Sequence, residues 1–193
     1  MTLNSGNNKT MKNINSKIIG KLTQDEQLDT FWVSQAQAIP FFEGIKLPVT
    51  YISNASETIE VFIEDADKAI QNFLQFVTND RLNITEYAYE NCKEFVEAVN
   101  EDWLNKLLEQ LVDKKSIWNH IEPTQIYVER RYYHDKDVYV SIACECEWEQ
   151  EHGLQFVFRQ GKKLTRVSTQ DGHLTEADAW GISDSEDKLL SAF

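Results

Sequence analysis

The sequence predicts an α+β fold with short N-terminal β-strands, three amphipathic helices and a C-terminal antiparallel β-meander. Three observations support this fold: short apolar runs over residues 17–53, apolar residues at helical spacing over 66–112, and two-residue alternation after residue 123. The 193 residues suit a single α+β domain, which we expect over 18–193. Residues 1–17, rich in Asn and Lys, are expected to form a disordered leader, within which Met11 is a second candidate start.

Apolar runs in the first quarter of the chain predict three or four short strands. The runs cover residues 18–19, 31–33, 39–42 and 47–52. Pro40 and Pro48 favour edge positions, because proline offers no donor to a hydrogen-bonded ladder. Residues 58–63 fit either one more strand or the approach to a helix.

Three helices are expected at residues 66–77, 84–99 and 103–112, where apolar residues recur every three or four positions. Residues that favour caps and turns separate them at 78–80 and 100–102. Cys92 falls in the apolar stripe of the second helix, which indicates core packing rather than reactivity.

The alternation after residue 123 determines which side chains face the core. Every second residue over 138–148 is apolar, so the thiols of Cys144 and Cys146 are expected to point inward. Ile126 and Val128 share this face if the preceding hairpin has an odd number of loop residues.

A five-residue loop over 149–153 would join this strand to the next one. It stacks apolar side chains across the ladder, and the expected pairs are Trp148 with Leu154, Cys146 with Phe156 and Cys144 with Phe158. A tight turn at Gln160 and Gly161 then leads to a strand over 164–169. Residues 175–178 resemble a capping box for a short helix that Gly181 would end, and residues 183–186 form a second box.

Two turns of this meander are expected to meet at one rim, because the strands between them run out and back. The rim gathers three carboxylates and two imidazoles, namely Glu149, Glu151, His152, Asp171 and His173. Such a group suits acid–base work or a divalent cation. The structural alternative is that glycines supply turn geometry, histidines cap loops and carboxylates face water. The chain has no zinc-binding helix motif, phosphate loop or nucleophile elbow.

The outward face of the meander is a candidate interface. It combines aromatic, arginine and carboxylate side chains: Tyr127, Arg131, Tyr139, Glu145, Glu147, Gln155 and Arg159. An ordinary solvated face with cross-strand ion pairs would show the same pattern. If helices cover this face, the interface hypothesis fails.

The cysteines indicate neither disulfides nor a metal. Cys92, Cys144 and Cys146 are odd in number, and a reducing cytoplasm fits them. Zinc would need two more ligands beside Cys144 and Cys146, while Cys92 is expected on a distant helix. We therefore expect no metal and no cofactor.

Charge and hydropathy argue against two classes of partner. With 32 acidic and 19 basic residues the net charge is −13, which repels nucleic-acid backbones. No apolar run approaches the roughly 20 residues of a membrane-spanning helix, and the N-terminus lacks the apolar centre of a signal peptide. A basic protein or a cation suits this field, although acidic surfaces also serve solubility alone.

Several segments resemble a bacterial family of unknown function. They are residues 39–42, 69–74, 117–123, 148–155 with the motif Trp-Glu-Gln-Glu-His-Gly-Leu-Gln, and 164–174 with Gln-Asp-Gly-His-Leu. The resemblance covers about residues 20–187 and implies a bacterial cytoplasmic protein, with no assigned activity, cofactor or catalytic residue. A more distant similarity, in the Glu-His-Gly turn after a strand that ends in Trp, is to toxin-immunity proteins.

Together these features favour a non-enzymatic protein-binding domain, with neutralisation of a basic toxin as the candidate role. The alternative is a metal-binding domain or metal-dependent hydrolase that uses the Glu149, Glu151, His152, Asp171 and His173 rim. A structural domain without a ligand pocket is the third hypothesis.

Overall fold

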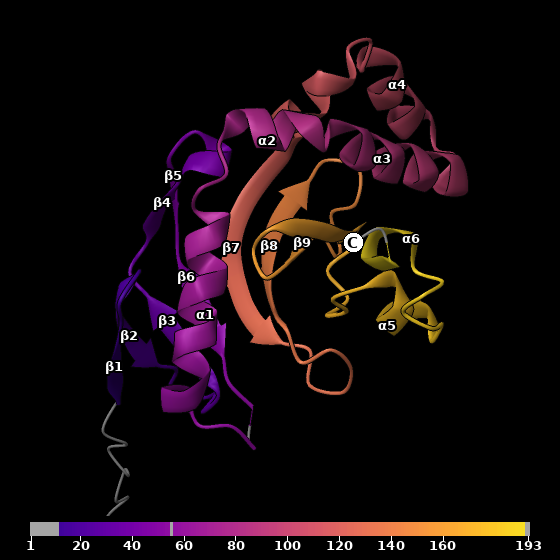
Figure 1. Ribbon diagram of the computed structural model, residues 1–193. Coiled ribbons are helices and arrows are strands. Elements are labelled where there is room, and N and C mark those ends of the chain that lie inside the picture. The colour runs from indigo at the N-terminus through magenta and orange to yellow at the C-terminus, as the bar shows by residue number, and fades with distance from the viewer. Residues whose placement is uncertain (1–11, 55, 192–193) are drawn as a thin grey trace, which may run out of the picture.

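The computed structural model describes residues 12–54 and 56–191. Its main feature is a curved, eight-stranded sheet (Figure 1). In their order across the sheet the strands are β1 (Asn13–Ser16), β2 (Gly20–Gln24), β3 (Phe31–Ser34), β6 (Val49–Ile52), β7 (Ile121–Arg130), β8 (Val138–Cys146), β9 (Leu154–Arg159) and β10 (Lys163–Ser168). Neighbouring strands are antiparallel except β6 and β7, which run parallel.

Two further strands, β4 (Gln37–Ile39) and β5 (Ile45–Leu47), form a separate antiparallel pair. The crossover from β6 to β7 holds helices α1 (Ile59–Phe73), α2 (Thr78–Asn83), α3 (Thr85–Val99) and α4 (Asp102–Gln110). The 3-10 turns are η1 (Pro40–Phe42) and η2 (Lys114–His120), and the short helices α5 (Glu176–Trp180) and α6 (Lys188–Ser191) follow β10. No helix within the described ranges is both long and apolar enough to cross a membrane.

The core lies between the helices of the crossover and one face of the sheet. Figure 1 shows α1 along that face, with α2 and α3 across one end of the strands. Four phenylalanines from η1, α1, the α1–α2 connection and β9 form its aromatic centre, with ring centroids 5.4 to 6.3 Å apart: Phe41, Phe73, Phe76 and Phe158. Ile126, Val128 and both sheet cysteines are buried on this face, as the alternation predicted.

The α+β class is confirmed, but the N-terminal part differs in detail. Residues 13–52 form β1 to β6 rather than three or four strands, and Pro40 and Pro48 lie between strands instead of at sheet edges. Residues 58–63 belong to the start of α1, not to a strand. The break expected at 78–80 instead begins α2, where the Asp80 carboxylate accepts a hydrogen bond from the Val77 backbone N–H at 2.8 Å. The described residues therefore contain more helices than the three expected.

The expectation of a disordered leader over 1–17 is wrong for its last part, because residues 13–16 form β1. The buried Asp67 carboxylate of α1 holds this strand, since it accepts hydrogen bonds from the Ser16 hydroxyl and from the Lys17 backbone N–H at 2.8 Å. The Tyr51 hydroxyl donates to the same carboxylate at 2.7 Å. Residues 1–11, with both candidate starts, lie outside the described residues.

The pairing expected between β8 and β9 is wrong in register and right in face. Cys144 pairs with Leu154 and not with Phe158, which lies opposite Val140. The shift is even, so the same side chains stay in the core. It arises because the loop is longer than five residues and the Trp148 indole N–H donates to Asn91 Oδ1 on α3 at 3.1 Å. This contact draws Trp148 out of the ladder and into the helical layer.

The turn between β9 and β10 packs directly on α1, which makes Gly161 a sensitive position. Its φ is +64°, and a Cβ there would lie 2.0 Å from the Ala69 carbonyl oxygen. We expect Gly161→Ala to lower the free energy of unfolding by about 3 kcal/mol or more, from backbone strain and collision together. Urea denaturation measures this loss.

Gly181→Ala is the matched control, because Gly181 has φ +65° but nothing within 4 Å of an added Cβ. Only the conformational strain remains there, so we expect a loss of about 1 kcal/mol. Equal losses in the two variants would contradict the packing of this turn on α1.

Candidate functional site

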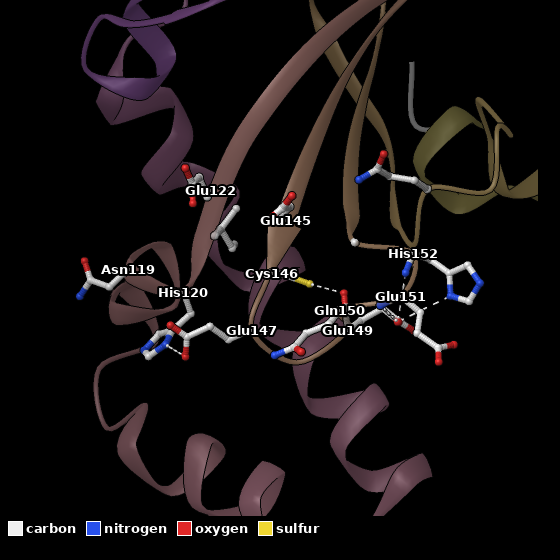
Figure 2. Close-up of a pocket in the computed structure, with 13 residues that line it drawn as sticks. Asn119, His120, Glu122, Glu145, Cys146, Glu147, Glu149, Gln150, Glu151 and His152 are labelled. Carbon is white, nitrogen blue, oxygen red and sulfur yellow. Dashed lines mark hydrogen bonds and ion pairs between the residues drawn. The ribbon is translucent and has the colours of Figure 1, made fainter.

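A hollow lined by carboxylates lies where β7 begins and β8 ends, and we call it the acidic cleft (Figure 2). Its volume is about 650 Å³. Five of its lining residues are glutamates and none is a lysine or arginine: Glu122, Glu145, Glu147, Glu149 and Glu151, with His120 and His152 as the titratable bases. The cleft therefore concentrates negative charge within a small part of an already acidic molecule.

Two of these glutamates face each other directly across the β7–β8 ladder. Glu122 is the register partner of Glu145, and both side chains are exposed. Like charges directly opposite each other destabilise an antiparallel pair. A β-bulge between Pro123 and Gln125 separates this pair from the regular part of the ladder. The arrangement costs stability in the free protein and suits a cation placed between the two carboxylates.

Two of the three remaining glutamates of the cleft, Glu147 and Glu149, already have partners. Glu147 Oε2 lies 2.9 Å from His120 Nδ1, and Glu149 Oε1 lies 3.6 Å from His152 Nδ1. The Glu149 carboxylate also accepts hydrogen bonds from the backbone N–H groups of Glu151 at 3.0 Å and His152 at 3.3 Å. Glu149 thus fixes the turn itself and is largely buried, whereas the structural alternative for the rim expected its carboxylate to face water.

The structure brings together three of the five residues expected at the rim and leaves two elsewhere. Glu149, Glu151 and His152 line the acidic cleft, whereas Asp171 and His173 do not. Asp171 forms a bidentate ion pair with Arg166, with both distances 2.7 Å. Burial opposes ionisation of Asp171, but hydrogen bonds from Arg166 and from the His173 backbone N–H outweigh it and hold its pKa below the ordinary value. The Asp171 carboxylate, which the sequence suggested as a metal ligand, is therefore already paired with Arg166.

The two turns do touch, although not through those side chains. The Gln170 backbone N–H donates to the His152 carbonyl at 3.4 Å, and its side-chain amide donates to the Cys144 carbonyl at 2.9 Å. Gly153 sits beneath this amide, with a positive φ of 63° and no room for a Cβ. Across residues 12–54 and 56–191, no group of three or more His, Cys, Asp and Glu side chains is placed to hold a metal ion. The described residues give the metal-site alternative no support.

The interface expected on the outward face does not form as one exposed surface. The segment after β10, including α5, covers part of this face, and Arg131, Tyr139 and Gln155 are buried beneath it. Tyr139 packs with Val157 and Leu174 in a small apolar cluster. The interface hypothesis therefore fails for these residues, because a helical segment covers them. The members that remain exposed, Glu145 and Glu147, line the acidic cleft.

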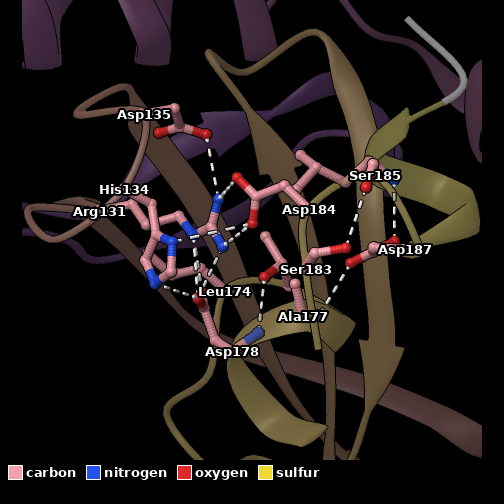
Figure 3. A network of polar contacts seen from close by, with 12 residues as sticks. Arg131, His134, Asp135, Leu174, Ala177, Asp178, Ser183, Asp184, Ser185 and Asp187 are labelled. Atoms are coloured by element: carbon pink, nitrogen blue, oxygen red, sulfur yellow. Dashed lines mark hydrogen bonds and ion pairs between the residues drawn. The ribbon is translucent and has the colours of Figure 1, made fainter. Parts of the chain in front are cut away.

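Arg131 is the centre of the buried charge under this cover (Figure 3). Its guanidinium bonds Asp178 at 2.7 and 2.9 Å, Asp184 at 2.7 and 2.9 Å, and Asp135 at 3.3 Å. Arg159 pairs in turn with Asp137 at 2.6 Å, and Tyr127 is half-buried on β7. These arginines hold the fold together and are not presented to a partner.

The three cysteines are free and buried, and they lie nearer to one another than expected. Burial raises the pKa of the Cys92 thiol to about 12, and Cys146 adds to this rise, so Cys92 on α3 is not distant from the sheet. Burial likewise raises the pKa of Cys146 to about 11 and that of Cys144 well above its ordinary value. None of these thiols is a nucleophile at neutral pH.

Sequence reasoning missed Glu122 and His120 in the acidic cleft, and Glu129 in a second cleft. Glu129 was detectable, because it alternates with Val128 and so shares the face of Tyr127. Glu122 was harder to detect, since the bulge at Pro123 changes the register before it is reached.

Comparison with known proteins places this chain in a family. The family model of a domain of unknown function, DUF6985, matches residues 18–174. The chain belongs to the DUF6985 family. This confirms the resemblance to an uncharacterised family, although the match ends at Leu174 and leaves α5 and α6 outside it. No curated protein matches the chain, and no solved structure matches it.

The opposed glutamates give a stability prediction for this DUF6985 protein. Glu122→Gln is expected to raise the free energy of unfolding by about 0.5 kcal/mol at low salt, because it removes a directly opposed like charge. The gain should shrink at high salt, where exposed charges are screened. Urea denaturation at two salt concentrations measures both effects.

The control is Glu64→Gln, which makes the same charge change at an exposed position on α1. We expect Glu64→Gln to leave stability nearly unchanged. If Glu122→Gln proved no more stabilising than Glu64→Gln at low salt, the two cleft carboxylates would not repel each other.

The Arg131 cluster gives a prediction about acid. Arg131→Met is expected to cost this DUF6985 protein about 3 kcal/mol at neutral pH, because it strands three carboxylates. Hydrogen bonds from Arg131 hold the pKa of Asp184 below its ordinary value, so this stabilisation is complete above that value and disappears as the pH falls through the depressed pKa. The difference between wild type and variant should therefore stay constant above about pH 5 and narrow as the pH falls below about 4 in urea denaturation.

Lys68→Met provides the control, because Lys68 pairs with Asp65 at 3.0 Å on the exposed surface of α1. An exposed pair of this kind contributes at most about 1 kcal/mol. A loss in Arg131→Met as small as that in Lys68→Met would show that the cluster does not stabilise the fold.

Proposed function

We propose that this protein binds a basic protein partner through the acidic cleft and catalyses no reaction. The observation that carries the proposal is the composition of the cleft wall, which has five glutamates and no lysine or arginine. A lysine or arginine side chain donates several charge-assisted hydrogen bonds and can reach more than one carboxylate. A partner with a basic segment is therefore the ligand that this wall recognises best.

The opposed pair of Glu122 and Glu145 supports the same conclusion energetically. Their repulsion is present in the free protein and is relieved when a cationic side chain lies between them. Binding then gains from the relief of strain as well as from new ion pairs. The net charge of −13 also attracts a basic partner over longer distances and raises the rate of encounter.

Catalysis receives less support from the same wall. Cys146 lines the cleft, but burial raises the pKa of its thiol to about 11, so it remains protonated at neutral pH. Glu149 is committed to its turn, and Glu147 is paired with His120. In its specific form the proposal is that the partner is a basic toxin, which this protein neutralises as an immunity protein of the bacterial cytoplasm.

The test measures binding of a fluorescent oligolysine peptide by anisotropy. We expect saturable binding that weakens as salt rises, and at least about tenfold weaker binding in the double variant Glu122→Gln/Glu145→Gln, because charge-assisted hydrogen bonds are lost. A basic protein that co-purifies with the wild type should, once isolated, bind the double variant more weakly than it binds the wild type.

The matched control is Glu64→Gln/Glu94→Gln, which removes two exposed carboxylates from α1 and α3 and leaves the same net charge. It should bind the peptide within about threefold of wild type, the residual effect expected from the overall field. Equal weakening in both double variants would show that net charge alone attracts the peptide and would overturn the acidic cleft as the site.

A further inference from the structure

A second cleft lies on the outward face of the sheet, and we call it the Glu129 cleft. It has a volume of about 570 Å³ and lies between the β7–β8 hairpin, the turn before Leu174 and the residues that follow α5. Glu129, close to the end of β7, contributes to its lining. Tyr133, Leu174 and Ile182 supply apolar surface, and the Tyr133 and Ile182 side chains are exposed.

Glu129 has no partner for its carboxylate. No hydrogen bond or ion pair to its side chain occurs among the residues that the structure describes, although the side chain is partly buried. Its ladder neighbours are Tyr139 on β8 and Ile52 on β6, and the Tyr139 hydroxyl donates to Asp135 instead. Burial alone raises the pKa of Glu129 to about 7. A carboxylate withdrawn from water without a partner is costly and calls for an explanation.

The cations around the cleft are already engaged. The Arg131 guanidinium is shared among Asp135, Asp178 and Asp184, so this cluster carries more negative than positive charge (Figure 3). Arg130 also lines the cleft, but its guanidinium pairs with Glu57 at 3.0 Å and Asp65 at 2.9 Å. Neither arginine forms an ion pair with Glu129.

We propose that the Glu129 cleft binds an alkylammonium group, with the charged end at the Glu129 carboxylate and the carbon chain along Tyr133, Leu174 and Ile182. This site is separate from the acidic cleft and does not rest on the proposed function. A lysine side chain of another protein and a free aliphatic amine share the required chemistry. The volume of about 570 Å³ accommodates either.

The chemistry of the wall selects this class of ligand. One carboxylate cannot supply the several oxygen ligands that calcium or magnesium requires, and no three candidate ligands converge in the described residues. An ammonium needs only one strong acceptor, and the Tyr133 ring adds apolar surface for the carbon chain. The exposed apolar side chains at the mouth favour an aliphatic chain over a small inorganic ion.

Binding should depend on pH through Glu129, because only the ionised carboxylate attracts the cation. The charged or titratable groups around it are Arg130, Arg131, Tyr132, Tyr133, His134, Tyr139, His173 and Asp178. Affinity should rise about tenfold between pH 6 and pH 8 as Glu129 loses its proton, since an ammonium group stays charged throughout this range. Because other titratable groups lie around the cleft, the variant below is needed to assign the effect to Glu129.

The experiment titrates the protein with n-butylamine and with a short peptide that contains one lysine, and it follows backbone amide shifts by NMR. We expect saturable shifts in the hairpin at 131–137 and around Leu174, with binding at least tenfold weaker in Glu129→Gln and no rise with pH in that variant. A peptide with norleucine in place of lysine should not bind. Binding of both ligands identifies the ammonium as the recognised group, and binding of the peptide alone identifies a lysine side chain as the ligand.

Two controls keep the proposal open to refutation. Glu64→Gln makes the same charge change on α1 and should bind like wild type. Tyr133→Ala alters an exposed side chain without touching the sheet, and it should weaken binding severalfold even if Glu129→Gln does not fold. The proposal is overturned if neither ligand saturates, if the norleucine peptide binds equally, or if folded Glu129→Gln keeps its affinity.

Discussion

The fold depends on the position of β7 between two differently built halves of the sheet. β7 pairs with β8 along its length and with β6 from Ile126 to Glu129. Because the β6 pair is parallel, the chain must cross from one end of the sheet to the other, and α1 to α4 make that crossing and cover the core on the way. The Gln125 side chain strengthens the junction by donating to Thr50 Oγ1 at 2.6 Å.

The same strand sets the distance between the two clefts. Glu122 lies near the start of β7 and Glu129 close to its end, so seven residues of extended chain separate them by roughly 20 Å. The intervening residues Ile126 and Val128 are fully buried, which anchors the strand in the core between the two glutamates. A rigid core element therefore carries the acidic groups of both clefts.

Charge is handled in opposite ways at the two ends of this sheet. Around Arg131, three carboxylates gather on one guanidinium, which is buried beneath the segment after β10. In the acidic cleft, Glu122 and Glu145 are opposed without a cation between them. The first arrangement stabilises the folded state, whereas repulsion between the two carboxylates in the second destabilises it.

The sequence predicted which face of each strand is buried better than it predicted which residues of different elements contact one another. Alternation at Val138, Val140 and Ile142 placed the core correctly, because side-chain direction in a strand depends only on local geometry. The pairing of Cys144 failed because it depends on the distant contact between Trp148 and Asn91, which no local pattern records. The cover over Tyr139 was not predicted for the same reason, since the capping box and Gly181 indicated the short helix α5 but not the sheet face on which it packs.

Prediction of the candidate site had the same limit. Glu149, Glu151 and His152 come from one turn, so their proximity follows from sequence alone. Asp171 does not join them, because its carboxylate pairs with Arg166. Arg166 lies beside a bulge in the β9–β10 ladder. Partner choice among long polar side chains is decided by tertiary geometry, which a single sequence does not specify.

The boundary of the family match has a consequence for how this molecule folds. The match stops at Leu174, yet Asp178 and Asp184, which neutralise Arg131, come after it. A polypeptide ending at that boundary would leave the Arg131 guanidinium without two of the three carboxylates that surround it. The folded structure therefore extends past the matched region, and the short segment after Leu174 supplies charge that a buried residue inside the match requires.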